Sequence, residues 1–412
     1  MSAFPALGLL VARNIVVAVA LALLVTGCAG LPRDAVPMEL ADTAGISRMP
    51  EARFWGDERS TALDASLVSR IDQVVRSGRV KHLRPGTRTN VDFLALSGGG
   101  GDGAFGAGLL VGWTVHGSRP VFEIVTGVST GALMAPFAFL GPAYDPHLRE
   151  IYTTLGTKQL LEFQLASGLL GGNAVADSSP LAKQIAKFVD RKLLDEIARE
   201  HRIGRRLYVA TTNIDAERPV IWDLGAIAQS SSDEALELFR KVLLASASIP
   251  GIFPPVRVRV RANKTDFEEL HVDGGTTAQV FFLPFEALLD DYARKKVSLD
   301  RVSRRLFVIR NTKVAPQWAA TPDQTLPIVE RSLSTITKSQ GVGNLYRLYL
   351  EARVQKMDFN YAAIPASFVM KSEEPFDKTY MRALFEAGYE LGRLGYQWDK
   401  APPGLPERLA KR

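Results

Sequence analysis

Cysteine is almost absent from this chain, which has one cysteine, Cys28, among 412 residues. A single cysteine excludes an intramolecular disulfide and a structural zinc site built from several thiolates. Histidine is also scarce, and its five copies, at positions 82, 116, 147, 201 and 271, show no metal-binding spacing such as H-x-x-x-H. We therefore expect neither a disulfide nor a bound metal ion.

Strong charge is also lacking. The net charge is +6, charged residues make up 23% and hydrophobic residues 46%, which are ordinary values for a globular protein and exclude a disordered or fibrous chain. There is no concentrated basic stripe, so we expect no nucleic-acid partner, and the mild positive charge suits an anionic lipid surface better. The length allows one large domain or two smaller ones, and no internal repeat is present.

The first 27 residues predict a targeting segment. Their only charged side chain is Arg13, and the apolar run Ile15–Val25 is too short for a confident transmembrane helix. The segment ends in LVTGC, which resembles a bacterial lipoprotein signal with cleavage before Cys28 and lipid attachment to that cysteine. The alternative is a retained anchor with an incidental cysteine. Because Ala29 stands where an inner-membrane retention signal usually has Asp, we expect the outer membrane of a bacterial envelope, facing the periplasm.

Two strand–turn–helix units follow each other in the region from residue 91 to residue 140. The apolar runs Val91–Leu96 and Val121–Thr126 predict buried strands, and each leads into a glycine-rich turn. Helical composition follows in Ala104–Trp113 and from Ala132 onward. Two such units in succession predict a parallel sheet with both turns at its carboxyl edge, where sites form in open α/β sheets.

The second turn reads GVSTG, with Ser129 between Gly127 and Gly131. A serine on a sharp strand-to-helix turn holds its hydroxyl above the sheet, and the amide-rich start of the following helix favours negative charge beside it. The alternative is a helix-capping serine between two packing glycines.

The first turn contains four successive glycines, Gly98 to Gly101, followed by Gly103. Bare backbone amides before a helix can hold an oxyanion or a phosphate. Read as G-x-G-x-x-G, the same glycines also match a dinucleotide fingerprint, with Glu123 at the distance of its acidic residue. Glu123 lies early in the second strand, whereas the fingerprint needs it at the strand's end, so a nucleotide-binding protein remains an alternative only.

A third motif is HVDGG, in which Asp273 opens a glycine turn, and ASASIPGIFPP lies just upstream. Together with the glycine loop and the G-x-S-x-G turn, these pieces resemble the patatin-like phospholipases over roughly residues 91 to 275. The resemblance implies a three-layer α/β hydrolase with a mainly parallel central sheet flanked by helices. It also implies action on membrane lipids or other acyl esters, with no cofactor.

The resemblance assigns roles by position. Ser129 is the nucleophile, Asp273 is its base in a Ser–Asp dyad, and the amides of Gly99, Gly100 and Thr130 form the oxyanion hole. The remaining motif glycines are Gly98, Gly101, Gly103, Gly127, Gly131, Gly274 and Gly275.

Two residues qualify this assignment. Asp102 stands in the glycine loop where the family usually has Arg or Lys, so its carboxylate argues against a phosphate at the loop, and we expect it to tune substrate choice. His271 would share a strand face with Asp273, which makes it an alternative base, although a hydrogen-bonded strand histidine is the commoner case.

The remaining pattern completes the expected organisation. We expect a signal peptide over 1–27, a tether with one helix over 28–90, a catalytic domain over 91–290, its C-terminal part over 291–400 and a loose tail over 401–412. Further helices and strands are expected throughout, including one or two long helices over Leu326–Met357, and the glycine-rich Ala166–Val175 reads either as a lid or as an ordinary loop. A lipid-binding or envelope-assembly protein with weak or lost activity is the alternative function on the same fold.

Overall fold

The structure is a computed structural model that describes residues 33–58, 61–77, 89–163, 174–283 and 302–405. Cys28 and the predicted signal segment lie outside the described residues, as do positions 166–173 of the predicted lid. No helix in the described ranges is long and apolar enough to cross a membrane.

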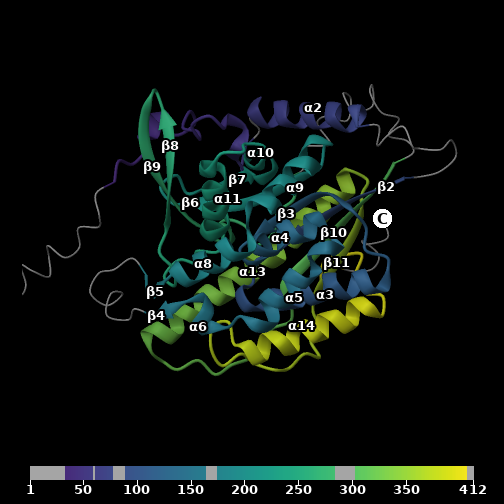
Figure 1. The fold of residues 1–412 in the computed structure, drawn as a ribbon. Coiled ribbons are helices and arrows are strands. Elements are labelled where there is room, and N and C mark those ends of the chain that lie inside the picture. The colour runs from purple at the N-terminus through teal and green to yellow at the C-terminus, as the bar shows by residue number, and fades with distance from the viewer. Residues whose placement is uncertain (1–32, 59–60, 78–88, 164–173, 284–301, 406–412) are drawn as a thin grey trace, which may run out of the picture.

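A central sheet of nine strands organises the molecule (Figure 1). Its path runs β1-β7-β6-β3-β2-β10-β11, and the β8–β9 hairpin joins it through β6. The five strands from β6 to β11 pair in parallel, whereas β1, β7, β8 and β9 join by antiparallel pairing. The strands are β1 (Arg53–Trp55), β2 (Thr89–Leu96), β3 (Phe122–Val128), β6 (Arg206–Asn213), β7 (Arg218–Asp223), β8 (Val256–Ala262), β9 (Thr265–Asp273), β10 (Val302–Lys313) and β11 (Asp358–Ile364), with β4 (Glu162–Phe163) and β5 (Ala176–Asp177) in a separate pair.

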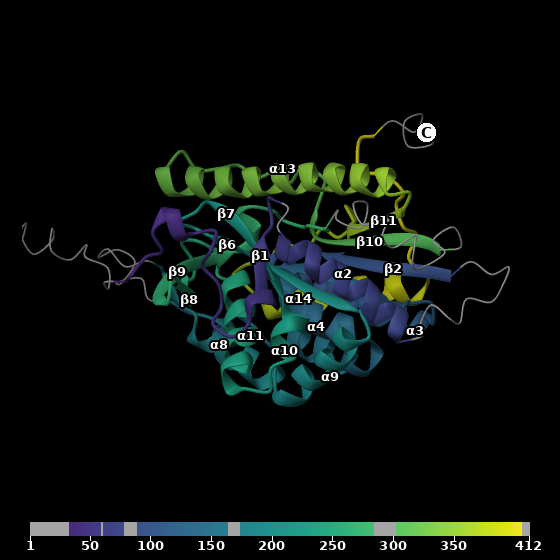
Figure 2. The same cartoon turned by 90° about the horizontal axis from the view of Figure 1, so that it is seen from above.

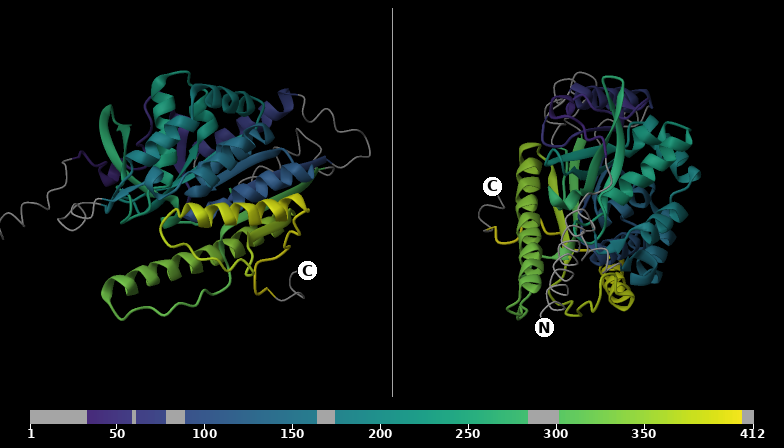
Figure 3. Two further views of the ribbon diagram at one scale, coloured as in Figure 1. Left: turned by 60° about the horizontal axis from the view of Figure 1, so that its bottom comes forward. Right: turned by 90° about the vertical axis from the view of Figure 1, so that its left-hand side faces the viewer.

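Alternate residues of the buried strands face two different cores, which gives three layers. Leu94 and Leu96 of β2 point into the larger core, and Phe93 and Ala95 point into the smaller one. Figures 2 and 3 show α13 on the smaller-core face and most other helices on the opposite face. The smaller core is covered by α2 (Thr61–Arg76) and α13 (Thr325–Val354), and the larger by α3 (Gly103–His116), α4 (Thr130–Leu140), α5 (Asp145–Thr154), α8 (Ser179–Phe188), α9 (Arg191–Arg202), α10 (Leu224–Ala228), α11 (Asp233–Ser246) and α14 (Lys378–Arg393).

Short helical turns complete the chain. They are η1 (Met38–Leu40), η2 (Pro50–Ala52), η3 (Gly100–Asp102), η4 (Pro142–Tyr144), α6 (Thr157–Leu160) and η5 (Gly274–Thr276). Two of them, η3 and η5, lie inside the glycine motifs that the sequence singles out.

The predicted fold class is confirmed: the two strand–turn–helix units supply β2 and β3, which pair in parallel as neighbours. The strand of the second unit is longer than predicted, because Gly127 still pairs with Leu96 and Val209, so β3 ends at Val128 and α4 begins at Thr130. The long C-terminal helix α13 is a single helix. Strand β11, between α13 and α14, was not predicted.

Helices α3 and α14 pack together through glycines on both partners. A Cβ atom built on Gly108 would lie 2.0 Å from the carbonyl oxygen of Phe385, and one built on Gly388 would lie 2.3 Å from that of Phe105. The two backbones are therefore in direct contact, and any side chain at these positions would push the helices apart.

This contact makes a stability prediction. Gly108→Ala should lower the free energy of unfolding by about 2 kcal/mol, because overpacking a rigid contact is destabilising. The control is Gly343→Ala in α13, where nothing lies within 4 Å of the added Cβ; it should raise stability by roughly 0.5 kcal/mol, since alanine is the better helix former. Urea unfolding of both variants measures this, and equal effects of the same sign would contradict the packing argument.

Candidate active site

Ser129 occupies the sharp turn between β3 and α4. Its backbone has φ 55° and ψ −125°, a conformation that is strained for any residue with a side chain. Ser246, at the end of α11, holds this turn: its hydroxyl accepts a hydrogen bond from the Ser129 amide at 3.0 Å and donates one to the carbonyl oxygen of Ala210 at 2.7 Å. The strain is thereby balanced by a fully buried hydrogen-bonded bridge to β6.

The glycine loop is fixed by Asn311 at the end of β10. The Asn311 side chain donates to the carbonyl oxygen of Ser97 at 2.8 Å and accepts from the Gly106 amide at 3.1 Å. Only glycine fits at position 99, since a Cβ there would lie 2.1 Å from the Asn311 carbonyl oxygen. Among the described residues, the amides of Gly99 and Gly100 donate no hydrogen bond, so they are free to bind an anion.

The two turns pack directly against each other. A Cβ on Gly131 would lie 2.4 Å from the carbonyl oxygen of Leu96, and one on Gly103 would lie 2.2 Å from the Thr130 hydroxyl. Gly100 of the loop and Thr130, the first residue of α4, consequently line the same cavity as Ser129, and an amide at the first position of a helix has no carbonyl partner within that helix. Among the loop glycines, Gly101 has room for a side chain, because a Cβ built there would have no neighbouring atom closer than 3.5 Å.

Asp273 ends β9 and begins the turn η5 beside Ser129. Its Oδ1 accepts from the Gly275 amide at 2.6 Å, while Oδ2 is buried and has no hydrogen-bond partner of good geometry among the described residues. Burial raises the pKa of Asp273 from 3.8 to about 7, and interaction with the Ser129 hydroxyl and the Gly275 amide only partly offsets that effect. A carboxylate with this pKa can act as a base near neutral pH.

His271 is buried in a separate hydrogen-bonding cluster. Its Nδ1 lies 2.8 Å from the Thr211 hydroxyl and its Nε2 lies 3.0 Å from Glu269, which also pairs with Arg53. Both ring nitrogens are therefore occupied, which leaves none for Ser129. The arrangement is that of a structural strand histidine.

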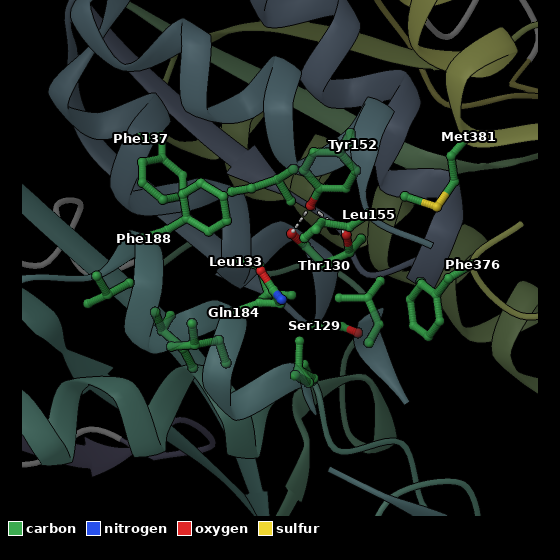
Figure 4. Close-up of a pocket in the computed structure, with 18 of the residues that line it drawn as sticks. Ser129, Thr130, Leu133, Phe137, Tyr152, Leu155, Gln184, Phe188, Phe376 and Met381 are labelled. Atoms are coloured by element: carbon green, nitrogen blue, oxygen red, sulfur yellow. Dashed lines mark hydrogen bonds between the residues drawn. The ribbon is translucent and has the colours of Figure 1, made fainter. Parts of the chain in front are cut away.

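A mostly apolar cavity opens beside Ser129, with about 740 Å³ of space between its walls, part of it open to solvent. Figure 4 shows the Ser129 hydroxyl among carbon side chains, with Phe137 and Phe188 on one side and Phe376 and Met381 on the other. Gly100 and Thr130 also line it. The cavity can therefore hold a hydrocarbon chain whose end lies at the serine and at the free amides.

Asp102 points away from this apolar cavity. Its carboxylate accepts a hydrogen bond of 2.7 Å from the Tyr380 hydroxyl of α14 and lines a different, polar cavity. Burial raises the pKa of Asp102 to about 6, although Tyr380, Lys313 and Lys338 act in the opposite direction.

Sequence reasoning overlooked several residues that shape this site. Ser246 lies within the segment ASASIPGIFPP, and Asn311 is a polar residue at the carboxyl end of a strand, so the sequence carried a signal that both could belong to the site. Tyr152, whose hydroxyl lies 2.7 Å from that of Thr130, carried none. In the described part of the chain, no group of three or more His, Cys, Asp or Glu side chains could hold a metal ion.

Comparison with known proteins identifies a domain that contains this site. Residues 94–288 match the family model described as Patatin-like phospholipase. The chain contains a patatin-like phospholipase domain. Such a domain supports lipid acyl hydrolysis as the general activity, and its matched range includes Ser129 and Asp273. Among solved structures the chain is similar to VipD from Legionella pneumophila, at 10% identity and a TM-score of 0.30, over 75% of this chain and 68% of that one. No curated protein matches the chain.

The patatin-like domain also depends on residues beyond the matched range. Asn311, Phe376, Tyr380 and Met381 all follow residue 288, yet they hold the glycine loop or line the cavities. The site therefore includes β10, α14 and the segment just before α14.

The raised pKa of Asp273 gives a stability prediction. Because the folded state holds this proton more tightly than the unfolded chain, stability falls as pH rises from about 4 to about 7, at about 1.4 kcal/mol per pKa unit at most. Asp273→Asn removes the ionisation, so the variant should gain stability relative to wild type between pH 4.5 and pH 8. Urea unfolding at both pH values measures the difference.

The control for this experiment is Asp266→Asn. Asp266 is exposed and hydrogen-bonded to Arg261, which lowers its pKa, so this variant should gain nothing on raising the pH. A stability difference between wild type and Asp273→Asn that stays constant between the two pH values would contradict the burial argument.

Proposed function

We propose that this protein is a serine lipid acyl hydrolase, a phospholipase A, lysophospholipase or related esterase, that uses a Ser129–Asp273 dyad. The observation that carries the proposal is the strained, buried Ser129 in the wall of an apolar cavity, with the buried carboxylate of Asp273 beside it, whereas both ring nitrogens of the neighbouring His271 are bonded elsewhere. The volume of this cavity and its mostly apolar lining suit a fatty acyl chain.

The chemistry follows from the positions of these groups. Asp273 takes the proton of the Ser129 hydroxyl as its oxygen attacks the ester carbonyl carbon, and the amides of Gly99, Gly100 and Thr130 stabilise the oxyanion that forms. Asp273 then gives the proton to the departing alcohol, which leaves an acyl-serine. Water, deprotonated by the same carboxylate, attacks that ester; the bond to Ser129 breaks, the fatty acid leaves, and Asp273 returns the proton to the Ser129 oxygen.

Burial supplies the basicity that an exposed aspartate lacks. A carboxylate with an ordinary pKa is a poor base for a serine hydroxyl, whereas one shifted to about 7 is better matched to neutral pH. The Ser129 amide is already bonded to Ser246, so the oxyanion donors must come from the glycine loop and the start of α4. The bonded Ser129 amide and the free amides of the glycine loop together support the proposed roles of Gly99, Gly100 and Thr130.

The dyad is tested by three variants on a soluble acyl ester. Ser129→Ala and Asp273→Asn should each lower turnover by about a thousandfold or more, and the double variant should be little worse than either, because the two groups act as a unit. Wild-type kcat/KM should rise with pH around pH 7, where Asp273 ionises. Covalent labelling of Ser129 by a fluorophosphonate separates an enzyme from a lipid-binding protein.

The control for this experiment is His271→Gln, with folding checked by thermal melting. If folded Asp273→Asn keeps most of its activity while folded His271→Gln has lost it, the histidine is the base and the dyad assignment is wrong.

We also propose that the protein is tethered to the bacterial envelope through a lipidated Cys28, in the outer membrane and facing the periplasm. Support comes from the sequence alone: an apolar leader of 27 residues ends at the only cysteine of the chain. Several acyl chains on one cysteine give a stable anchor, whereas a single chain gives marginal binding.

Cys28→Ser tests the tether. The variant should stay unprocessed and should fail to incorporate labelled palmitate, whereas wild type should be labelled and should fractionate with membranes. Ser129→Ala serves as the control, since it should be labelled like wild type. Equal palmitate incorporation into wild type and Cys28→Ser would refute the proposal.

A further inference from the structure

A second cavity adjoins the glycine loop. Gly98 and Asp102 line it, whereas Gly100 lines the apolar cavity, so the loop contributes to the walls of both. It holds about 680 Å³ of space, part of it open to solvent. Its other walls come from the end of β10 and from the middle of α13, which passes over β10 (Figure 2). Most side chains that line this second cavity are polar, unlike those of the apolar cavity beside Ser129.

The charged side chains of this second cavity are mostly positive. Arg310, Lys313 and Lys338 line it, against the single carboxylate of Asp102. Burial, together with the charges of Arg310, Arg331 and Lys313, lowers the pKa of Lys338. The cations therefore repel one another, and an anion between them would relieve that repulsion.

Arg310 is the best-defined of these cations. It is only 3% exposed, its Nε donates to Thr312 at 2.7 Å and one terminal nitrogen donates to the carbonyl oxygen of Lys338 at 3.1 Å. Its other terminal nitrogen, Nη1, is buried and has no hydrogen-bond partner within the described residues. Gly341 makes room for this arrangement, because a Cβ there would lie 2.8 Å from the guanidinium.

An unpartnered guanidinium nitrogen in a buried site is costly unless a ligand satisfies it. A guanidinium presents its donors in a planar fork that matches phosphate oxygens, and lysine ammonium groups add point charge around them. Asp102 is engaged by Tyr380 at 2.7 Å, so the carboxylate does not neutralise Arg310 through a direct hydrogen bond.

We propose that this cavity binds a phosphate group, with Arg310 as its principal ligand and Lys313 and Lys338 as its counter-charges. The position favours the head group of an anionic phospholipid as the source, because a Cβ built on Gly98 would lie 3.2 Å from the Cβ of Ser129. One lipid would then place an acyl chain in the apolar cavity and its phosphate in the second. This choice of source rests on the hydrolase function proposed above, whereas phosphate binding itself does not.

Binding is measured by calorimetry on the Ser129→Ala protein, which separates this test from any failure of hydrolysis. The ligands are inorganic phosphate, dihexanoyl phosphatidic acid and the matching neutral dihexanoyl glycerol, the lipids below their micelle concentrations. Lys338→Gln and Arg310→Met should each weaken binding of the phosphate-bearing ligands by about tenfold, the effect of one charge-assisted hydrogen bond or close charge. Asp102→Asn should strengthen it, because a competing negative charge is removed.

The matched control is Arg347→Gln, which removes a positive charge from the same helix outside the cavity and is not among the charges that act on Lys338. It should change affinity by less than about twofold at physiological salt, because screening weakens charges outside the site. Lys338 lies at the cavity surface, so its variant keeps the test valid if Arg310→Met fails to fold.

The outcomes are distinct. If phosphatidic acid binds more tightly than the neutral glyceride and inorganic phosphate competes with it, the cavity binds the phosphate of a lipid head group. If inorganic phosphate binds but does not compete with phosphatidic acid, the cavity binds free phosphate instead. The proposal is overturned if no phosphate-bearing ligand binds, or if Arg347→Gln weakens binding as much as Lys338→Gln does.

Discussion

Backbone contact between the two glycine turns is the constraint on which the rest of the site depends. With Gly131 against the carbonyl oxygens of Leu96 and Ser97, the start of α4 sits within atomic contact of the end of β2. That contact holds Ser129 next to the glycine loop, whose residues line both cavities. Ser246 and Asn311 then secure it from β6 and β10 with buried hydrogen bonds.

The same burial that shapes the site also provides its reactivity. Asp273 is covered on all sides, which disfavours its charge and turns a weak carboxylate base into one suited to neutral pH. Such a base lowers the stability of the folded protein, a trade-off typical of functional sites. The proposed dyad needs no histidine, and His271 instead links β9 to β6 through its hydrogen bond with Thr211.

Features set by local sequence pattern could be predicted from the sequence, whereas partners that come from distant parts of the chain could not. Glycine turns after buried apolar strands predicted the two strand–turn–helix units and the turn positions of Ser129 and Asp273, because their spacing follows from strand and helix geometry. The partners Ser246, Asn311 and Tyr380 come from elements far along the chain, so no local pattern placed them beside the turns. Strand β11 was missed because it is a short run between two long helices, with a polar Asn360 buried at its centre.

The pairing of β2 with β10 has a consequence for how the protein is made. Asp92 and Arg305 are ion-paired across 213 positions, and Asp102 and Tyr380 are hydrogen-bonded across 278. A chain emerging from its N-terminus therefore exposes Ser129 long before β10 and α14 exist to fix the glycine loop. Contacts of such long range form late in folding. The arrangement of Ser129, the glycine loop and the two cavities is therefore complete only once almost the whole chain has been made and has folded.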